Sequence, residues 1–195
     1  NLFSAPVRGV TELVALSKRQ PMNVSSAGSG SANHLGVVDI ALISGLKWQH
    51  VPFRGGAAAL GDTAAGNTQL CLNGMLATMP LVTAGRLKLI GVSKATRMAL
   101  IGSVPTIAEQ GVKGFESGTY QGVAIPSSMP NAAAEKLAAA LIAVIRSPDV
   151  RARLVGAGAE VMTTTPKETS DFLVRESKRW ASVIQRAGTQ LEGSA

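Results

Sequence analysis

The chain has 195 residues, of which 46% are hydrophobic and 16% are charged, so it can bury a substantial core and is too apolar for a disordered tail. Its formal net charge of +7 would suit a nucleic-acid-binding protein, but the longest basic runs are pairs, Lys18-Arg19 and Lys178-Arg179, without a ladder of aromatic residues. We therefore interpret the charge as a solvated basic surface and expect no nucleic-acid partner. No apolar run reaches the roughly 18 residues of a membrane span, so we expect no direct membrane insertion.

One cysteine and two histidines limit the chemistry that the chain can carry. Cys71 cannot form an internal disulfide, and its apolar neighbours indicate a buried structural thiol. Together with His34 and His50 it is too little for a zinc site unless carboxylates join. The 12 acidic residues are spread along the chain without a close pair for acid–base work. We expect no metal, no cofactor and no catalytic residue.

The first half of the chain alternates between helical and extended patterns. Glycines at 45, 66 and 85 stand where three of the helices should end. The predicted elements are helix 11–19, strand 22–25, helix 32–44, strand 47–52, helix 57–65, strand 68–72, a helix ending near residue 84, and strand 86–93.

The second half is richer in helices. Thr106 and Glu109 form a capping box that predicts a short helix ending at Gly111, and a strand is expected at 119–125. After Pro126 and Pro130 the pattern predicts helix 132–146, a helix from 148 to about 155, strand 160–162 and a long final helix that opens at Thr165.

This alternation predicts an α/β fold with a mostly parallel central sheet flanked by helices on both faces. Ligands of such folds bind at the carboxyl ends of the strands, where loops lead into helix N-termini. Three loops of this kind occur, at Ser25–Ser31, Pro52–Gly56 and Leu72–Gly74. We expect all three at one edge of the sheet.

The loop Ser26–Ser31 is the most informative of the three. Gly28 and Gly30 permit tight turns and a close approach of the backbone to a ligand, while Ser29 and Ser31 add hydroxyl groups beside a helix start that favours anions. The dinucleotide fingerprint fails because Asn33 replaces its third glycine, and no Gly-Lys-Ser/Thr closes a phosphate loop. A plain serine-capped helix remains the alternative.

Four other side chains or turns are candidates at the same edge. Arg54 beside Gly55 could form a bidentate pair with a carboxylate, or could be a surface arginine at a turn. Asn73 could donate to a ligand or cap the next helix. Tyr120 could line the same cleft or anchor the lobe.

His34, one turn into its helix, raises the possibility of catalysis. A catalytic histidine needs a nucleophile and an orienting acid, and no Gly-x-Ser-x-Gly signature frames a serine here. Packing is the simpler interpretation. The alternative function is a small α/β enzyme that uses the Gly28–Ser31 loop as an anion site for a phosphorylated or carboxylated metabolite, with His34 as its base.

Read together, four segments resemble the substrate-binding receptors of tripartite tricarboxylate transporters, the Bug-type extracytoplasmic receptors. The serine and glycine loop before His34-Leu35 is similar to the family's loop, and 51–55 resembles its Val-Pro-Tyr-Lys-Gly turn. Segment 84–88 resembles Ala-Gly-Lys-Leu-Arg, and 104–111 matches Val-Pro-Thr-x-x-Glu-x-Gly almost letter for letter. The chain departs from the family at Asn73-Gly74, where Asp-Asn is usual, and at Tyr120-Gln121, which replaces a more aromatic pair.

The resemblance implies lobes like those of type II periplasmic binding proteins, with residues 1–124 as the second ligand-binding lobe and 125–195 crossing back to complete the first. The family carries a further strand–helix stretch before the segment that matches Asn1, so the N-terminal part of the first lobe and the leader are expected to lie outside this chain. The implied protein is periplasmic and not an enzyme. It binds a small carboxylate, such as a di- or tricarboxylate, an amino acid or an aromatic acid, and delivers it to membrane permease subunits. The candidate ligand-binding residues are Ser26, Gly28, Ser29, Gly30, Ser31, His34, Arg54, Gly55, Asn73 and Tyr120.

Overall fold

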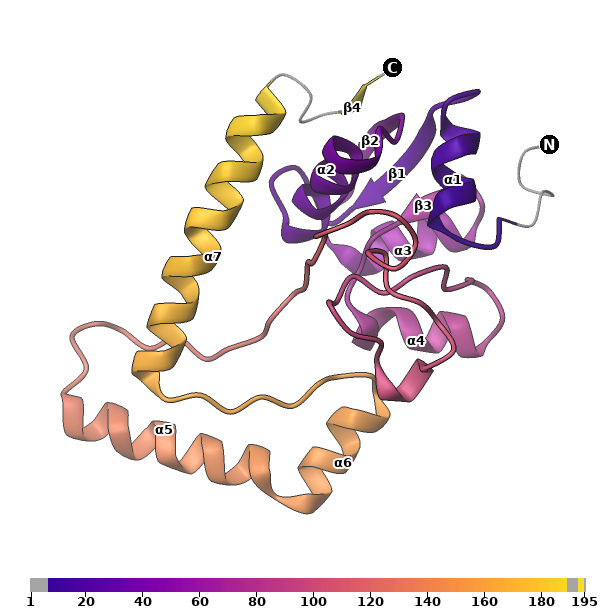
Figure 1. Cartoon of the computed structure of the whole chain (residues 1–195). Coiled ribbons are helices and arrows are strands. Elements are labelled where there is room, and N and C mark those ends of the chain that lie inside the picture. Colours follow the sequence, from indigo (N-terminus) through magenta and orange to yellow (C-terminus); the bar gives the residue numbers. More distant parts are fainter. Residues whose placement is uncertain (1–6, 189–192, 195) are drawn as a thin grey trace. The chain divides into compact units, whose positions relative to one another are not determined.

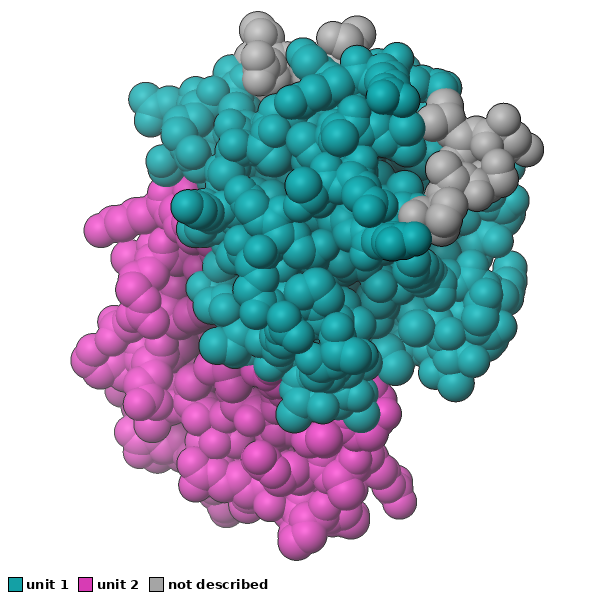
Figure 2. Space-filling view, turned by 45° about the vertical axis from the view of Figure 1, so that its right-hand side comes forward, with its two compact units in different colours: residues 1–119, 181–195 teal, residues 120–180 magenta. Residues whose placement is uncertain are grey.

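The computed structural model describes residues 7–188 and 193–194. The chain divides into two compact units, Asn1–Thr119 with Ala181–Ala195 and Tyr120–Trp180 (Figure 2). The expected lobes divide the chain between residues 124 and 125, whereas these compact units divide it after 119 and after 180. The assignment of the units to two receptor lobes stays a prediction.

The first unit is built on a four-stranded sheet with the strand order β3-β1-β2-β4 (Figure 1). The central strand β1 (Met22–Ser26) pairs in parallel with β2 (Trp48–Pro52) and with β3 (Leu70–Cys71), and β4 (Gly193–Ser194) is antiparallel to β2. The predicted α/β fold with a mostly parallel sheet is confirmed. Because β1, β2 and β3 run in one direction, their carboxyl ends lie at one edge.

Four helices accompany this sheet: α1 (Val10–Ser17), α2 (Ala32–Ser44), α3 (Gly56–Ala64) and α4 (Met75–Thr83) (Figure 1). Local signals set their ends as predicted. Gly45 ends α2 in the left-handed conformation with φ 73°, which other residues adopt at a cost. The core contains the fully buried side chains of Val24, Val37, Val38, Leu46 and Trp48.

The segment that follows α4 is less regular than the sequence predicts. Strand 86–93 is absent, and only an isolated bridge joins Val92 to Thr106. Segment 86–91 instead lines a cleft of about 750 Å³ together with residues of α1, α3 and β3. The prediction was wrong because an alternating segment becomes a strand only where a neighbouring strand provides backbone hydrogen-bond partners. The edge strand β3 has just two residues and provides few of them.

The capping box after this segment forms without the helix it was expected to open. The Thr106 N–H donates to Glu109 Oε2 at 2.6 Å, and the Glu109 N–H donates to Thr106 Oγ1 at 3.0 Å. The hydrogen bond and ion pair with Arg97 hold the pKa of the Glu109 carboxyl below its usual range, and the bond from the Thr106 N–H adds to this effect. Turns follow instead of an α-helix, and η2 (Ala99–Ile101) is the one short helix between α4 and α5.

The second unit contains α5 (Asn131–Arg146), α6 (Pro148–Gly156) and most of α7 (Pro166–Ala187). The three helices match their predictions, and the Thr165–Glu168 capping box opens α7 with reciprocal bonds of 2.8 and 3.2 Å. The strands predicted at 119–125 and 160–162 are absent. Within the described parts of this unit the two segments have no strand to pair with, and apolar side chains such as Met162 are largely exposed. No described helix combines the length and the hydropathy that a membrane crossing needs.

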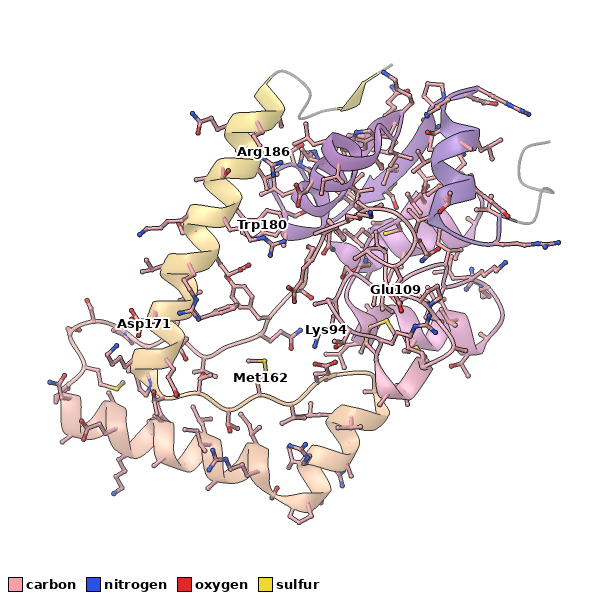
Figure 3. All side chains as sticks on the ribbon, in the orientation of Figure 1. Lys94, Glu109, Met162, Asp171, Trp180 and Arg186 are labelled. Atoms are coloured by element: carbon pink, nitrogen blue, oxygen red, sulfur yellow. The ribbon has the colours of Figure 1, made fainter. Side chains whose placement is uncertain are left out.

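The last turns of α7 belong to the first unit and are fixed there by a buried acid. Val183 and Ala187 are buried, and Nη2 of Arg186, which is labelled in Figure 3, donates to Asp39 Oδ1 of α2 at 2.9 Å. The side chain of Asp39 is 8% exposed and that of Arg186 is 52% exposed. Loss of the arginine would leave the carboxylate buried without its cation.

We expect Arg186→Gln to destabilise the first unit by about 1–2 kcal/mol, less than for a fully buried pair because water can partly replace the half-exposed guanidinium. The measurement is urea unfolding followed by tryptophan fluorescence in a Trp180→Phe background, so that the signal comes from Trp48, which is buried in this unit. Lys167→Gln is the matched control, since it removes a surface ion pair with Asp171 from the same helix and should cost less than about 0.5 kcal/mol. Equal losses in the two variants would contradict a special role for the Asp39 pair.

Candidate functional site

Three loops meet at the carboxyl edge of the parallel strands, as the sequence predicts. The Phe53 N–H donates to the Ser26 carbonyl at 3.0 Å, which joins the loop after β2 to the end of β1. The Asn73 Nδ2 donates to the Gly56 carbonyl at 2.8 Å, which joins the loop after β3 to the start of α3. The Asn33 Nδ2 lies 3.3 Å from Asn73 Oδ1 and adds the start of α2.

The starts of α2, α3 and α4 give this edge its electrostatic character. The first intrahelical bonds are donated by Leu35, Ala59 and Thr78, so the amides that precede them have no acceptor within their own helices. None of the three helices has an acidic residue in its first turn. Each helix therefore presents the positive end of its dipole without an attached carboxylate, and exposed Arg54 lies in one of the loops. The edge is suited to an anion.

The glycine and serine loop after β1 uses most of its donors within the protein. Gly28 and Gly30 have φ of 122° and 76°, which explains why glycine stands at both positions. The Gly28 N–H donates to Ser26 Oγ at 3.1 Å, the Gly30 N–H to His34 Nδ1 at 3.0 Å, and the Ser31 N–H to the Gly28 carbonyl at 3.1 Å. These amides shape the loop, which the sequence did not reveal.

Ser29 and Ser31 have different places in this loop. Ser31 Oγ accepts from the His34 N–H at 3.2 Å, so the interpretation of Ser31 as a helix cap is confirmed. Ser29 is exposed between the two glycines. Contact of a ligand with Ser29 and with the first amides of α2, those of Ala32 and Asn33, stays a prediction.

The loop after β2 brings the backbone into α3 through Gly55. Gly55 is the N-cap of α3 and has φ 106°, a conformation in which a side chain would be strained. Arg54 is exposed beside it, in the position that the sequence predicts for a cation at this edge.

Asn73 joins all three loops with one side-chain amide. Besides its bonds to Gly56 and Asn33, its Oδ1 accepts from the Gly74 N–H at 2.8 Å, at the start of α4. The side chain thus sets the spacing of three helix starts. An aspartate, which the resembled family usually has here, would lack the N–H that donates to the Gly56 carbonyl.

Two histidines and Trp48 form a buried layer beneath the first loop. The rings of His34 and His50 stack with centroids 3.9 Å apart, and His50 Nε2 lies 2.6 Å from Ser26 Oγ. His34 was expected among the ligand contacts, but it is 2% exposed and reaches the loop from below. The sequence does not predict His50 as a site residue, although its two-residue spacing from Trp48 on a strand places both side chains on one face.

The distance between Ser26 Oγ and His50 Nε2 would suit a nucleophile and its base, but a substrate has no access to the hydroxyl. Ser26 is 1% exposed, and its Oγ also lies within hydrogen-bond distance of the Gly28 amide and carbonyl. A substrate cannot reach this hydroxyl without displacement of the loop. The geometry supports a structural use of the pair.

Cys71 is half-buried next to the same edge. Burial raises the pKa of its thiol, and bonds with Ser25, Asn73 and Thr63 offset part of this effect. A thiol that stays protonated is a poor nucleophile, which agrees with the structural role expected from the sequence. The described residues contain no group of three side chains suited to hold a metal ion.

Tyr120 belongs to the second unit. Its side chain is 54% exposed, and its ring packs edge to face against Phe172 with centroids 4.9 Å apart. Its expected place beside the three loops stays a prediction.

Comparison with known proteins identifies relatives over nearly the whole chain. Residues 3–189 match the family described as "Tripartite tricarboxylate transporter family receptor". A UPF0065 protein from the tcbD-tcbE intergenic region of Pseudomonas sp. strain P51 is 31% identical over 180 residues, which are 91% of this chain and 54% of that protein. Protein BugT of Bordetella pertussis is 26% identical, over 92% of this chain and 56% of BugT. The chain therefore spans about half the length of these relatives.

Solved structures share the fold. The structure of R. palustris Rpa4515 with adipate is 29% identical, with a TM-score of 0.90 over 95% of this chain and 62% of that one. The periplasmic binding protein BugD is 26% identical, with a TM-score of 0.85 over 99% of this chain and 65% of its own. MatC from Rhodopseudomonas palustris with bound malate is also 26% identical, with a TM-score of 0.82 over 93% of this chain and 64% of MatC.

We expect Gly56→Ala to disturb the bridge between the loops, because a Cβ there would lie 2.8 Å from both terminal atoms of the Asn73 amide. The side-chain amide resonances of Asn73 should shift in a ¹H–¹⁵N spectrum. Gly61→Ala is the matched control in the same helix, since a Cβ at Gly61 meets nothing within 4 Å. The control should raise stability by about 0.5–1 kcal/mol and leave Asn73 unchanged, whereas Gly56→Ala should gain less or lose stability. An unshifted Asn73 amide in Gly56→Ala would contradict the bridge.

Proposed function

The chain belongs to the tripartite tricarboxylate transporter receptor family, and from that membership we propose that it is a solute receptor whose three-loop edge binds a small carboxylate. The observation that carries the proposal is the meeting of three helix N-termini, none with an acid in its first turn, at the carboxyl ends of parallel strands. A carboxylate accepts several hydrogen bonds, and bonds to a charged group contribute about 1.5–3 kcal/mol each.

The ligands of two relatives support the carboxylate class. One solved neighbour is described with adipate and another with bound malate, and both ligands are dicarboxylates. They differ in length and in hydroxylation. A cradle made of backbone amides can tolerate such differences because it recognises the carboxylate group instead of the chain that carries it. We propose the same recognition for this protein without assigning one acid.

The donors of this edge would supply one side of an enclosed site. Small ligands are held tightly when most of their surface is buried, and this chain spans about two thirds of the receptors it matches in structure. We propose that residues 1–124 correspond to the second lobe and that 125–195 help to complete the first, with Tyr120 near the cleft. The protein would act outside the cytoplasm and deliver its ligand to membrane permease subunits.

We propose binding without catalysis. The enzymatic alternative needs His34 as a general base beside the glycine loop, but His34 is 2% exposed and its Nδ1 accepts the Gly30 N–H. A proton of a bound metabolite has no path to that lone pair while the loop keeps this conformation.

We expect the 195-residue chain to bind carboxylates with millimolar affinity, because one lobe supplies only part of the donors and no enclosure. Titration of mono-, di- and tricarboxylates, followed by calorimetry and by NMR shifts, measures this. The full-length adipate-binding relative is the positive control and should bind its acid in the micromolar range, a difference of about 4 kcal/mol. Micromolar binding by this chain alone would show that the two-lobe proposal is wrong.

We expect Arg54→Gln to weaken the binding of adipate or malate about fivefold, because Arg54 lies at the carboxyl edge of the sheet. Lys47→Gln is the matched control, since Lys47 is an exposed cation that precedes the same strand at its opposite end. The control should change the affinity less than twofold. Equal weakening by both substitutions would indicate attraction to the net charge and not binding at the proposed edge.

A further inference from the structure

The buried ring layer beneath the loop after β1 has an arrangement that core packing alone does not require. His34 comes from the first turns of α2, and His50 and Trp48 come from β2. The two imidazoles are nearly parallel, with 13° between their planes, while Trp48 lies 5.8 and 5.9 Å from them at 51°. The three side chains are 8% exposed or less.

Each imidazole contacts a different point of the loop above. His50 Nε2 lies 2.6 Å from the hydroxyl of Ser26, where β1 ends, and the same hydroxyl accepts the Gly28 N–H. His34 Nδ1 accepts the N–H of Gly30 at 3.0 Å. The stacked pair therefore holds the loop at both ends of the short stretch that contains Ser29.

The loop needs such an external restraint because its own residues supply little. Gly28 and Gly30 both have positive φ and no side chain, so the stretch has wide conformational freedom in the absence of these bonds. An anion site must present its donors in a fixed arrangement before the ligand arrives, since ordering on binding reduces affinity.

We propose that His34 and His50 are positioning residues for carboxylate binding, which together fix the loop so that Ser29 and the first amides of α2 face the ligand. The proposal rests on the proposed function and adds to it that specificity for a ligand geometry is set from the buried layer. Neither histidine touches the ligand. Each acts through a hydrogen bond that restrains the conformation of the loop before the ligand binds.

The chemistry of the two contacts yields conservative variants that distinguish hydrogen bonding from packing. The Gly30 N–H needs a lone pair two bonds beyond Cβ at position 34, which asparagine supplies with Oδ1 and glutamine does not. The contact to Ser26 needs a polar atom three bonds beyond Cβ at position 50, which glutamine supplies and asparagine does not. At each position one variant keeps the hydrogen bond and the other loses it. His34→Asn is therefore the control for His34→Gln, and His50→Gln is the control for His50→Asn.

The experiment measures hydrogen exchange of the Gly30 amide and adipate affinity by NMR titration in all four variants. His34→Asn should keep the protection of Gly30 and stay within about twofold of wild-type affinity, and His50→Gln should behave in the same way. His34→Gln should lose the protection of Gly30 and bind adipate about five- to tenfold more weakly, with a similar loss of affinity in His50→Asn. Urea midpoints show whether affinity follows the hydrogen bond or the overall stability.

A spectrum of the wild-type protein tests the key contact without any substitution. A long-range ¹H–¹⁵N correlation should show His34 Nδ1 as the unprotonated nitrogen, with a coupling across the hydrogen bond from Gly30. A protonated Nδ1 would overturn the proposal even if every variant failed to fold.

Other outcomes also decide the question. Equal behaviour of asparagine and glutamine at position 34 would mean that the imidazole only fills space. Loss of Gly30 protection with unchanged adipate affinity would overturn the link between the loop and the ligand. If the wild-type protein binds none of the mono-, di- and tricarboxylates in the titration, the proposed function fails, whereas selective loss of Gly30 protection in His34→Gln still supports the pair as the anchor of the loop.

Discussion

The parallel pairing of β1 with a strand on each side is the constraint from which the candidate site follows. Because β1 lies between β2 and β3 and runs in their direction, three strand-to-helix loops must emerge at one edge. Each loop then leads into a helix whose first amides lack intrahelical acceptors. The sheet's topology therefore brings hydrogen-bond donors and positive helix ends together at one edge. Arg54 adds a side-chain cation to this edge.

Two sets of polar side chains, Asn73 and the stacked histidines, fix the geometry of this edge. The Asn73 amide spans the starts of α2, α3 and α4 with one acceptor and one donor group. The stacked histidines restrain the glycine loop from the opposite, buried side. Both sets of side chains form hydrogen bonds with backbone groups of the loops and so hold the loops in one conformation. The donors that remain for an anion are therefore preorganised. Neither set is expected to touch the ligand through a charge.

The comparisons and the exposed surface of the second unit bear on the proposed division into lobes. The chain matches its relatives over nearly all of its own length but spans about half of theirs. In the second unit, α5 has no buried residue and Met162 is 72% exposed. Exposed apolar surface of this kind is typical of interaction sites, and the proposed role of 125–195 in completing the first lobe would use it.

The sequence by itself determined what depends on neighbours along the chain. Bonds within a few residues set the helix ends at Ser31 and Gly45 and the capping box of Thr165 and Glu168. The order of strand and helix patterns along the chain predicts the α/β fold. Only the tertiary structure decided which extended segments became strands, since 86–93 acquires no more than the isolated bridge from Val92 to Thr106 and 119–125 forms no strand. It also decided that His50 meets Ser26 and that Asn73 meets Gly56, because these contacts join residues 24 and 17 positions apart. Local signals fix local bonds, whereas contacts between distant residues depend on how the whole sheet brings them together.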